Sequence, residues 1–456
     1  MMYNPLLLPE LKEMLRTQDR PGLEELLDEL HAATLAEFSA GLSSQEIWEL
    51  LSYAPVERQA EVFSYFPLSK QVELVQEGDP ERVAKTLEAM PHDARVDLLK
   101  QLDEKLVEQL LPLVRPSDRR DIRHLLSYPE HSAGAVMTTD FAWIPAHVTV
   151  EEALQRLRQQ AAECETIYYV YVLDRYQHLV GLVSLRELLL AQPQQCVEEI
   201  MQSEVISVRV DQDQEEAARV LAKFDLLALP VVDPQNRLVG IITHDDVIDV
   251  MQQEATEDAL HMAAVAPLEE NYLEAPFARV WERRAIWLSC LFIAELFTFT
   301  ALAHFEHAIQ AVTALALFVP LCISTGGNSG SQAATLVTRA LAVGQVRLDQ
   351  WWKVLRHELL MGLALGVTLG AIAFVRAMFT PESILDGVDA WLLAQVVALS
   401  VAGICLWGTL VGSMLPLLFQ RFGMDPGYAS TPFVATFVDV TGIIIYFSIA
   451  QALLLA

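Results

Sequence analysis

One carboxylate, Asp439, lies in the middle of the otherwise uncharged segment PFVATFVDVTG near the C-terminus. A carboxylate surrounded by hydrocarbon is costly, so it must face water, a cation or a partner. No basic residue of the sequence lies at a matching depth. A structural salt bridge or a protonated acid would also satisfy the group, but we favour a cation ligand that lines a pore. Pro432, seven residues earlier, removes a backbone donor and would free carbonyl groups toward the same path.

A second segment, PLCISTGGNSGSQAATLVTRA at 320–340, gathers small and polar residues within an apolar run and interrupts it. Its glycines favour close packing between helices. Its polar side chains, Asn328, Ser331 and Thr335 among them, would form one wall of a pore. We expect both properties to hold for the same segment.

Five acidic residues recur at spacings of 3, 5, 3 and 1 in a stretch that carries no Lys or Arg from 238 to 278. They are Asp246, Asp249, Glu254, Glu257 and Asp258. The spacing approximates one face of a helix, predicted over 247–265. A solvated acidic face is the simple interpretation. However, like charges at helical spacing cost a few tenths of a kcal/mol per pair, so basic residues elsewhere or cations must offset the repulsion. Oxygen ligands suit Mg²⁺ or Ca²⁺ rather than zinc.

Two segments repeat at a spacing of 59, namely VLDRYQHLVGLVSLREL at 172–188 and VVDPQNRLVGIITHDDV at 231–247. Each predicts a pair of strands followed by a helix, and an amphipathic helix precedes each pair. The repeat resembles a tandem of cystathionine-β-synthase (CBS) domains, a regulatory module. Its usual ligand is an adenine nucleotide, held by a Thr or Ser and an Asp after the last strand. Thr243 and Asp246 match this pattern, and the first copy departs from it with Glu187.

Residues 55–116 contain a repeat of 12, in which Pro, Asp or Arg marks each start and an apolar pair follows in the first five units. Each unit predicts a short helix, and stacking such helices makes a solenoid. We interpret this region as an acidic scaffold for protein contacts.

The charge distribution divides the chain. Residues 1–275 carry 22 Lys and Arg against 50 Asp and Glu, whereas residues 276–456 carry 9 against 10. An acidic soluble part therefore precedes a membrane part, and nucleic acid is excluded as a partner. Five scattered cysteines fit a reducing compartment, and no cleaved signal peptide is expected. The segment HELLM at 357–361 lacks the second His of a zinc protease and no Walker loop occurs, so we do not expect an enzyme.

Five apolar stretches are long enough, or nearly so, to cross a bilayer as helices: 286–303, 311–338, 359–375, 390–420 and 426–456. The basic links precede the first, join the second to the third, and join the fourth to the fifth. These links are predicted to be cytoplasmic, with the N-terminal domains inside the cell and the C-terminus outside an inner (plasma) membrane. Glu295 interrupts the first stretch, and its role is open between a structural one and a pore-lining one.

The whole chain resembles the MgtE family of magnesium channels. The segments LLSYPEHSAGAVMT, ATED, GGNSGSQAATLVTRALA and PFVATFVDVTG look like family signatures in the family's order. The resemblance implies a multi-domain membrane protein with an all-α N-terminal solenoid (1–130), α/β tandem CBS domains (131–195 and 196–252), an acidic connecting or plug helix (247–275) and an α-helical transmembrane domain of five spans (276–456).

The resemblance also implies site residues. Asp439 from each protomer of a homodimer would bind hydrated Mg²⁺ on the two-fold axis, helped by the carbonyl of Ala435 and by Thr335. Ser331 and Thr431 stand where some members carry Asn. ATP at the first CBS copy would use Tyr169 and Arg186, although Glu187 and Leu226 depart from the expected residues. Regulatory Mg²⁺ would bind between protomers or domains at Asp93, Asp97, Glu215, Asp225, Asp246, Asp249, Glu254, Glu257 and Asp258.

The predicted function is Mg²⁺ uptake through a Mg²⁺-selective channel gated by cytosolic Mg²⁺. At high Mg²⁺ the metal bridges the acidic domains and holds the pore shut, and at low Mg²⁺ their repulsion opens it. One alternative is a carrier that couples divalent cations to Na⁺ or H⁺, which would show no unitary conductance. The other is a CBS-based membrane sensor without transport, in which Asp439 would be dispensable for flux.

Overall fold

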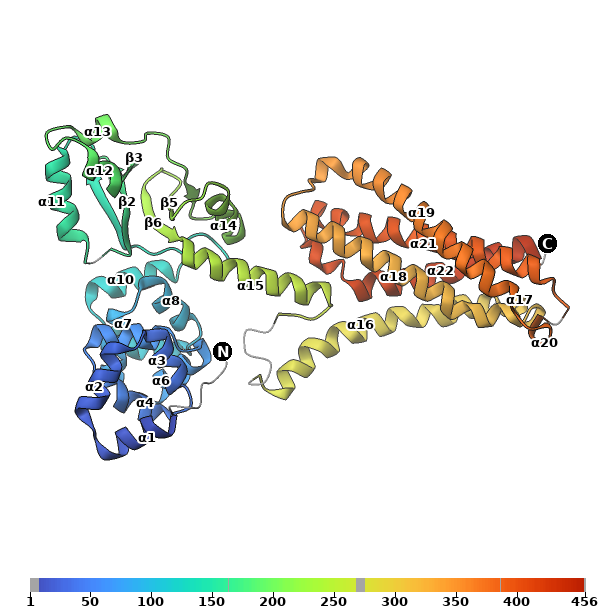
Figure 1. Ribbon diagram of the computed structural model, residues 1–456, viewed down its shortest axis with the longest axis horizontal. Coiled ribbons are helices and arrows are strands. Elements are labelled where there is room, and N and C mark those ends of the chain that lie inside the picture. The colour runs from blue at the N-terminus through green and yellow to red at the C-terminus, as the bar shows by residue number, and fades with distance from the viewer. Residues whose placement is uncertain (1–7, 163, 268–274, 386, 455–456) are drawn as a thin grey trace. The chain divides into compact units, whose positions relative to one another are not determined.

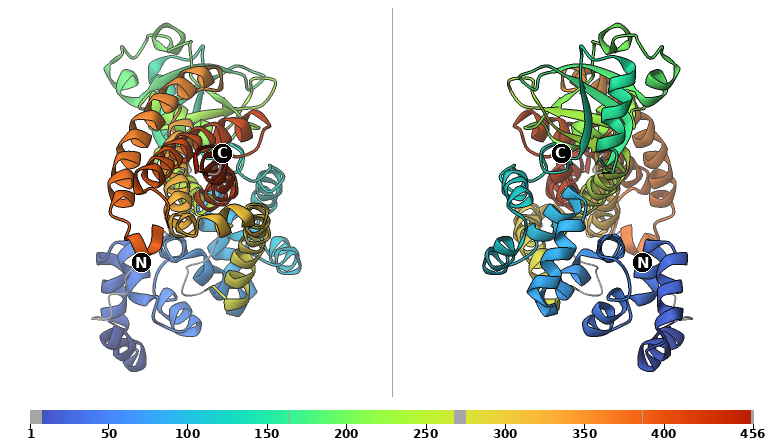
Figure 2. Two further views of the ribbon diagram at one scale, coloured as in Figure 1. Left: turned by 90° about the vertical axis from the view of Figure 1, so that its right-hand side faces the viewer. Right: turned by 90° about the vertical axis from the view of Figure 1, so that its left-hand side faces the viewer.

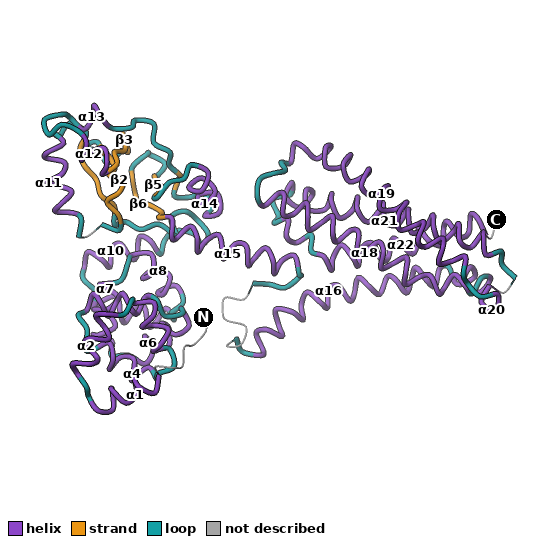
Figure 3. Tube along the Cα trace, viewed as in Figure 1, coloured by secondary structure: helices purple, strands orange, loops and turns teal. Residues whose placement is uncertain are grey.

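The computed structural model describes residues 8–162, 164–267, 275–385 and 387–454. The chain forms two units, residues 1–252 and 253–456. Figure 1 labels their elements, and Figure 3 shows that strands occur in the first unit, whereas the second is helical.

The first unit begins with a solenoid of short helices. They are α1 (Leu8–Thr17), α2 (Arg20–Glu29), α3 (Ala32–Ser39), α4 (Ser44–Leu51), α5 (Val56–Ser64), α6 (Leu68–Glu77), α7 (Pro80–Ala89), α8 (His92–Lys100), α9 (Glu104–Leu110) and α10 (Pro116–Leu125). The N-caps of α5 to α10 fall at the six repeat markers, from Pro55 to Arg115. Alternate helices contact each other, as α5 does α7 and α6 does α8. The predicted 12-residue helical repeat is confirmed.

The CBS region contains two sheets of three strands. The first holds β1 (Phe141–Pro145), β2 (Thr166–Leu173) and β3 (Leu179–Ser184), and the second holds β4 (Val208–Arg209), β5 (Ala228–Val232) and β6 (Leu238–Thr243). In each sheet the first two strands are parallel and the last two antiparallel. The helices are α11 (Val150–Gln160), α12 (Leu185–Leu190), α13 (Val197–Ile200) and α14 (Gln214–Lys223). The predicted strand pairs and their preceding helices are confirmed.

Helix α15 (His244–Met262) begins in the first unit and ends in the second. The second unit continues with α16 (Phe277–His304), α17 (Glu306–Ala311), α18 (Ala314–Ala342), α19 (Trp351–Met378), α20 (Glu382–Leu385), α21 (Ala390–Arg421) and α22 (Thr431–Leu454), with the short 3₁₀ helices η2 (Leu348–Gln350) and η3 (Pro426–Tyr428). The long helices of this unit share one general direction, and Figure 2 views them end-on.

Four segments of the described chain combine the length and apolarity of a membrane span: Phe277–His304, Leu348–Met378, Ala390–Arg421 and Thr431–Leu454. Helix α18 has 29 residues, so its length of about 43 Å also suffices to cross a bilayer. Its polar residues lower its mean hydropathy, so α18 is not among the four apolar segments named above.

The small and polar residues of 320–340 interrupt the apolar run, as predicted, but they do not break the helix, because α18 runs unbroken through Pro320 and the glycines. One local expectation about these helices was wrong. Pro432 frees no carbonyl within a span, because it is the second residue of α22. Backbone N–H groups in the first turn of a helix have no intrahelical partner in any case.

Helix α21 is the centre of the second unit, since it packs against α18, α19 and α22. A Cβ atom on Gly408 of α21 would lie 2.5 Å from the carbonyl oxygen of Gly326, and one on Gly366 of α19 would lie 2.8 Å from that of Ala402. The helices therefore meet backbone to backbone, as the glycines of 320–340 had predicted for α18.

Candidate pore and regulatory residues

Asp439 and the Gly-rich segment, the two predicted pore elements, lie against each other. Asp439 is half-buried on α22. A Cβ atom on Gly327 of α18 would lie 3.3 Å from its Oδ1 and 3.4 Å from the Cβ of Ala435. One turn of α22 therefore presents a carboxylate and Ala435 to the small-residue face of α18.

The other predicted pore residues lie on the same helix. Asn328, Ser331 and Thr335 follow one another at spacings of 3 and 4, which places them on one face of α18. The Oγ of Ser331 donates to the carbonyl oxygen of Thr431 at 3.3 Å, which ties α18 to the first turn of α22. Asn328 and Thr335 are exposed. The protomer thus presents a polar face on α18 beside Asp439.

Glu295 lies on α16, which packs against α22. The Oγ1 of Thr298 donates to its Oε1 at 3.2 Å, and its charge interacts with that of Asp439. Glu295 therefore belongs to the electrostatic surroundings of the candidate pore acid.

The acidic residues of α15 have different local roles. Asp246 accepts hydrogen bonds from the backbone N–H and the hydroxyl of Thr243 at 3.2 and 2.6 Å. Glu187 accepts the equivalent bonds from Ser184 in the first copy, at 2.8 and 2.7 Å. The Thr/Ser and acid pair therefore caps a helix in both repeats. The extra methylene of Glu187 leaves this capping intact.

The remaining regulatory candidates are dispersed over the described chain. Glu215 pairs with Arg219 at 2.5 Å, and Asp97 with Lys100 at 3.6 Å. Asp225 follows α14 in the left-handed region, with φ of 51°. Asp249 is exposed, whereas Glu254, Glu257 and Asp258 are half-buried. The side chain of Asp93 on α8 lies outside the described part of the structure, as do residues 268–274 of the predicted plug segment.

Asp93 and Asp97 flank a buried basic residue that fixes α8. Arg95 is 2% exposed and donates to the carbonyl oxygen of Met90 at 2.8 Å. Val96 of the same helix packs into the core of the second CBS repeat. Burial lowers the pKa of the neighbouring His92, so its imidazole is neutral at pH 7. The N-domain acids are thus held on a helix that is docked against the CBS region.

Within the described residues, no group of three or more His, Cys, Asp or Glu is arranged to hold a metal ion. The chemistry of the donors, which are carboxylates, does suit Mg²⁺. The prediction that the ions bind between protomers or domains stays a prediction.

The sequence reasoning missed His261. Its Nδ1 lies 2.7 Å from Oδ2 of Asp425, and its Nε2 lies 3.8 Å from Oε1 of Glu257. Its ring stacks on Tyr428, with 5.0 Å between centroids. The end of α15 is thereby attached to η3, the segment that leads into α22. The spacing of four from Glu257 pointed to a helical pair, but nothing local pointed to Asp425.

The nucleotide candidates lie at the end of the first sheet. Tyr169 on β2 is opposite Ser184 on β3, and the exposed Arg186 follows two residues later on α12. Thr243, the candidate of the second repeat, occupies the cap described above.

Comparison with known proteins decides the family. The magnesium transporter MgtE of Thermus thermophilus is 40% identical to this chain over 447 residues. The match covers 97% of this chain and 98% of the Thermus protein. The chain belongs to the MgtE family. The Bacillus subtilis MgtE is 31% identical, with 99% and 98% of the two chains covered. The profile of the MgtE divalent cation transporter matches residues 319–449, that of the MgtE intracellular N domain matches 30–131, and that of the CBS domain matches 133–193 and 197–253.

Two solved structures of soluble domains each cover about half of this chain. The cytosolic domain of the Mg²⁺ channel MgtE in complex with ATP is 38% identical, covers 54% of this chain and 100% of its own, and has a TM-score of 0.51. The soluble part of a magnesium transporter is 36% identical, with 54% and 98% covered and a TM-score of 0.52. The predicted MgtE resemblance and fold class, with its helical N domain and its CBS sheets, are confirmed.

Proposed function

We propose that this chain is the protomer of a homodimeric Mg²⁺ channel that mediates Mg²⁺ uptake and closes when cytosolic Mg²⁺ is high. The observation that carries the proposal is the placement of Asp439 and Ala435 against Gly327 of α18, in a unit of apolar helices. Membership of a magnesium transporter family supports the choice of ion.

The pore proposal follows from the electrostatics of Asp439. Two such carboxylates on a two-fold axis repel each other unless a cation lies between them. Mg²⁺ gives up its water reluctantly, so carboxylates, the Ala435 carbonyl and the polar face of α18 suit an octahedral hydrate better than a dry cage would. Thr335, Ser331 and Asn328 would contact the outer waters of the ion.

The membrane topology we propose has five spans, with α18 as the second. Helix α18 packs its small-residue face against both α21 and α22, which are apolar enough to span. Its exposed polar residues Asn328 and Thr335 would face the water-filled pore rather than lipid. Basic residues gather where α18 leads into α19: Arg339 in the last turn of α18, Arg347 in the link and Lys353 in the first turn of α19. Because basic links face the cytoplasm, the link between the second and third spans is cytoplasmic. The N-terminal domains, two spans earlier, are then also cytoplasmic, and the C-terminus, three spans later, is outside.

Gating would act through α15. Its acids, together with Glu215, Asp225, Asp93 and Asp97, would be bridged by Mg²⁺ between protomers or domains, which favours the closed state. His261 transmits the position of α15 to η3 and so to the start of the pore helix α22. ATP would bind at the CBS region beside Tyr169 and Arg186, a ligand supported by the ATP complex of a similar cytosolic domain.

The test is Mg²⁺ flux into liposomes by Asp439→Asn and Asp439→Ala, with Asp349→Asn as the matched control. Asp349 is an exposed acid of the same unit that lies outside the candidate pore. We expect the two Asp439 variants to lose flux while the dimer stays folded, and the control to keep it. Wild-type flux from a well-folded Asp439→Ala protein would refute the pore assignment.

A further inference from the structure

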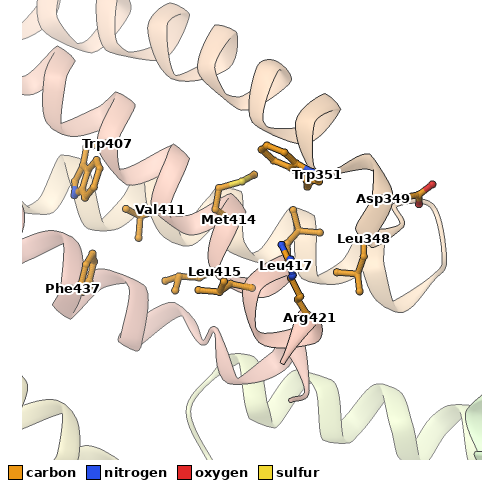
Figure 4. Close-up of a pocket in the computed structure, with 11 residues that line it drawn as sticks. Leu348, Asp349, Trp351, Trp407, Val411, Met414, Leu415, Leu417, Arg421 and Phe437 are labelled. Carbon is orange, nitrogen blue, oxygen red and sulfur yellow. The ribbon is translucent and has the colours of Figure 1, made fainter. Parts of the chain in front are cut away.

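The second unit contains a pocket of about 640 Å³ that the proposed transport function does not use. It lies between η2, the start of α19, the second half of α21 and α22 (Figure 4). Its lining is almost wholly apolar: Leu348, Trp351, Trp407, Val411, Met414, Leu415, Leu417, Leu418 and Phe437, with Asp349 and Arg421 as the charged members.

The two ends of the pocket differ in character. Figure 4 shows Arg421, Trp351, Leu348 and Asp349 at one end, and Trp407 and Phe437 at the other. Asp349 pairs with Arg347 at 3.2 Å, and it is the one carboxylate among the described residues that line the pocket. The guanidinium of Arg421 therefore keeps a net positive charge at the mouth of an apolar space.

This pocket is separate from the candidate pore. Phe437 and Asp439 are two residues apart on α22, which places them about 200° apart around the helix. Thr441, one turn after Phe437, accepts a hydrogen bond from Nε1 of Trp407 at 2.8 Å, and this bond fixes the inner wall. Access to the pocket is thus on the face of α22 that points away from Asp439.

The pocket lies at the membrane end that carries the basic residues. Arg347, Lys353, Arg356 and Arg421 belong to this end, and the indoles of Trp351 and Trp352 are 50% and 61% exposed. Tryptophan at a bilayer interface sits at the level of the lipid headgroups. Basic pockets between transmembrane helices at the cytoplasmic surface bind the headgroups of anionic lipids.

We propose that this pocket binds an anionic phospholipid, with its phosphate at Arg421 and Trp351 and an acyl chain along Val411, Met414, Leu415 and Phe437. The volume lies within the roughly 300–1,000 Å³ typical of ligand sites. Charge complementarity selects the occupant, because a guanidinium at the mouth favours a headgroup of net negative charge over a zwitterionic one. A second copy of the chain would instead have to bring its own acidic group to Arg421.

The experiment uses the full chain, reconstituted in bilayers of equal phosphatidylglycerol and phosphatidylcholine with matched acyl chains, extracted and analysed by native mass spectrometry. The variants are Arg421→Gln, which removes the charge, and Leu418→Trp, which fills the mouth at a residue that is already 46% exposed. Arg356→Gln is the control, since Arg356 is exposed at the same end but does not line the pocket. Each variant is first checked for the wild-type size-exclusion profile.

The wild type and Arg356→Gln should retain phosphatidylglycerol in preference to phosphatidylcholine. Arg421→Gln should reduce retained phosphatidylglycerol about fivefold, equivalent to about 1 kcal/mol for one basic residue. Leu418→Trp should reduce both lipids. Equal retention of the two lipids by the wild type, or unchanged retention in both pocket variants, would overturn the proposal. So would efficient disulfide cross-linking of Leu418→Cys between protomers, since a second copy would then cover the site.

Discussion

The contact between α18 and α21 gives the sharpest test of how the fold holds the candidate pore. A Cβ atom on Gly412 would lie 2.0 Å from the carbonyl oxygen of Gly330 and 3.0 Å from its Cα. These atoms are backbone, so no side chain can rotate away. Gly412→Ala must move the helices apart from 2.0 Å to the 3.4 Å at which ordinary contact begins, a displacement of 1.4 Å.

The cost of such overpacking is about 1–3 kcal/mol. The displacement also carries α18 away from its place beside Asp439, so we expect Mg²⁺ flux to fall several-fold and the melting temperature in detergent to fall by several degrees. Gly403→Ala is the matched control on the same helix, because its added Cβ would meet its nearest neighbour at 3.7 Å. Both substitutions replace Gly by Ala within α21 and so raise the intrinsic helix propensity equally. The difference in melting temperature and flux between the two variants therefore reports the steric clash alone.

The assays are thermal unfolding of the purified protein and flux into liposomes, run on both variants. If Gly412→Ala matched Gly403→Ala in melting temperature and in flux, the close contact of α18 and α21 would not exist as described. If only the melting temperature fell, the packing would be confirmed but its coupling to the pore acid would be refuted.

Three further predictions concern the cytosolic domains and their connection to α22. Deleting residues 1–130 should leave an inserted, transporting protein whose flux is less completely suppressed at high cytosolic Mg²⁺, since the stacked helices pack mainly on one another and, among the described residues, share only Val96 and Leu125 with the buried core of the second CBS repeat; failure to insert would contradict this. Changing Asp246, Asp249, Glu254, Glu257 and Asp258 together to Asn or Gln should make both flux and protease resistance insensitive to a Mg²⁺ titration, and an unchanged midpoint would mark these acids as a solvated face. His261→Phe, which keeps the ring but loses the bond to Asp425, should raise the half-inhibiting Mg²⁺ concentration about fivefold, as loss of about 1 kcal/mol implies; Asn236→Gln, a polar change in the CBS turn, should leave it unchanged.

The sequence was sufficient where the structural signal is local. The markers at Pro55, Pro67 and Asp79 are N-caps, and a capping residue acts within one turn of its helix. The repeat at a spacing of 59 likewise predicted two strand pairs, because an apolar run and the turn that follows it are short-range signals. Asp439 could be identified from the local sequence, because a single charged residue within an apolar segment is evident without knowledge of its contacts.

Long-range contacts could not be predicted in the same way. Asp425 lies 164 positions after His261, and no periodicity connects them. The glycines of α18 predicted close packing, but not that their counterparts would be Gly408 and Gly412 of α21. The capping role of Asp246 was also hidden behind its expected role as a ligand.

The central claim is that this chain conducts Mg²⁺ and closes in response to the same ion on its cytosolic side. The most direct measurement is Mg²⁺ flux through the wild-type protein in oriented liposomes, with the cytosolic face held first at low and then at high Mg²⁺. We expect flux at low cytosolic Mg²⁺ that is suppressed, reversibly, at high Mg²⁺, with unitary currents at the low concentration. Flux that is the same at low and high cytosolic Mg²⁺, or no flux at either concentration, would contradict the proposed Mg²⁺-gated channel.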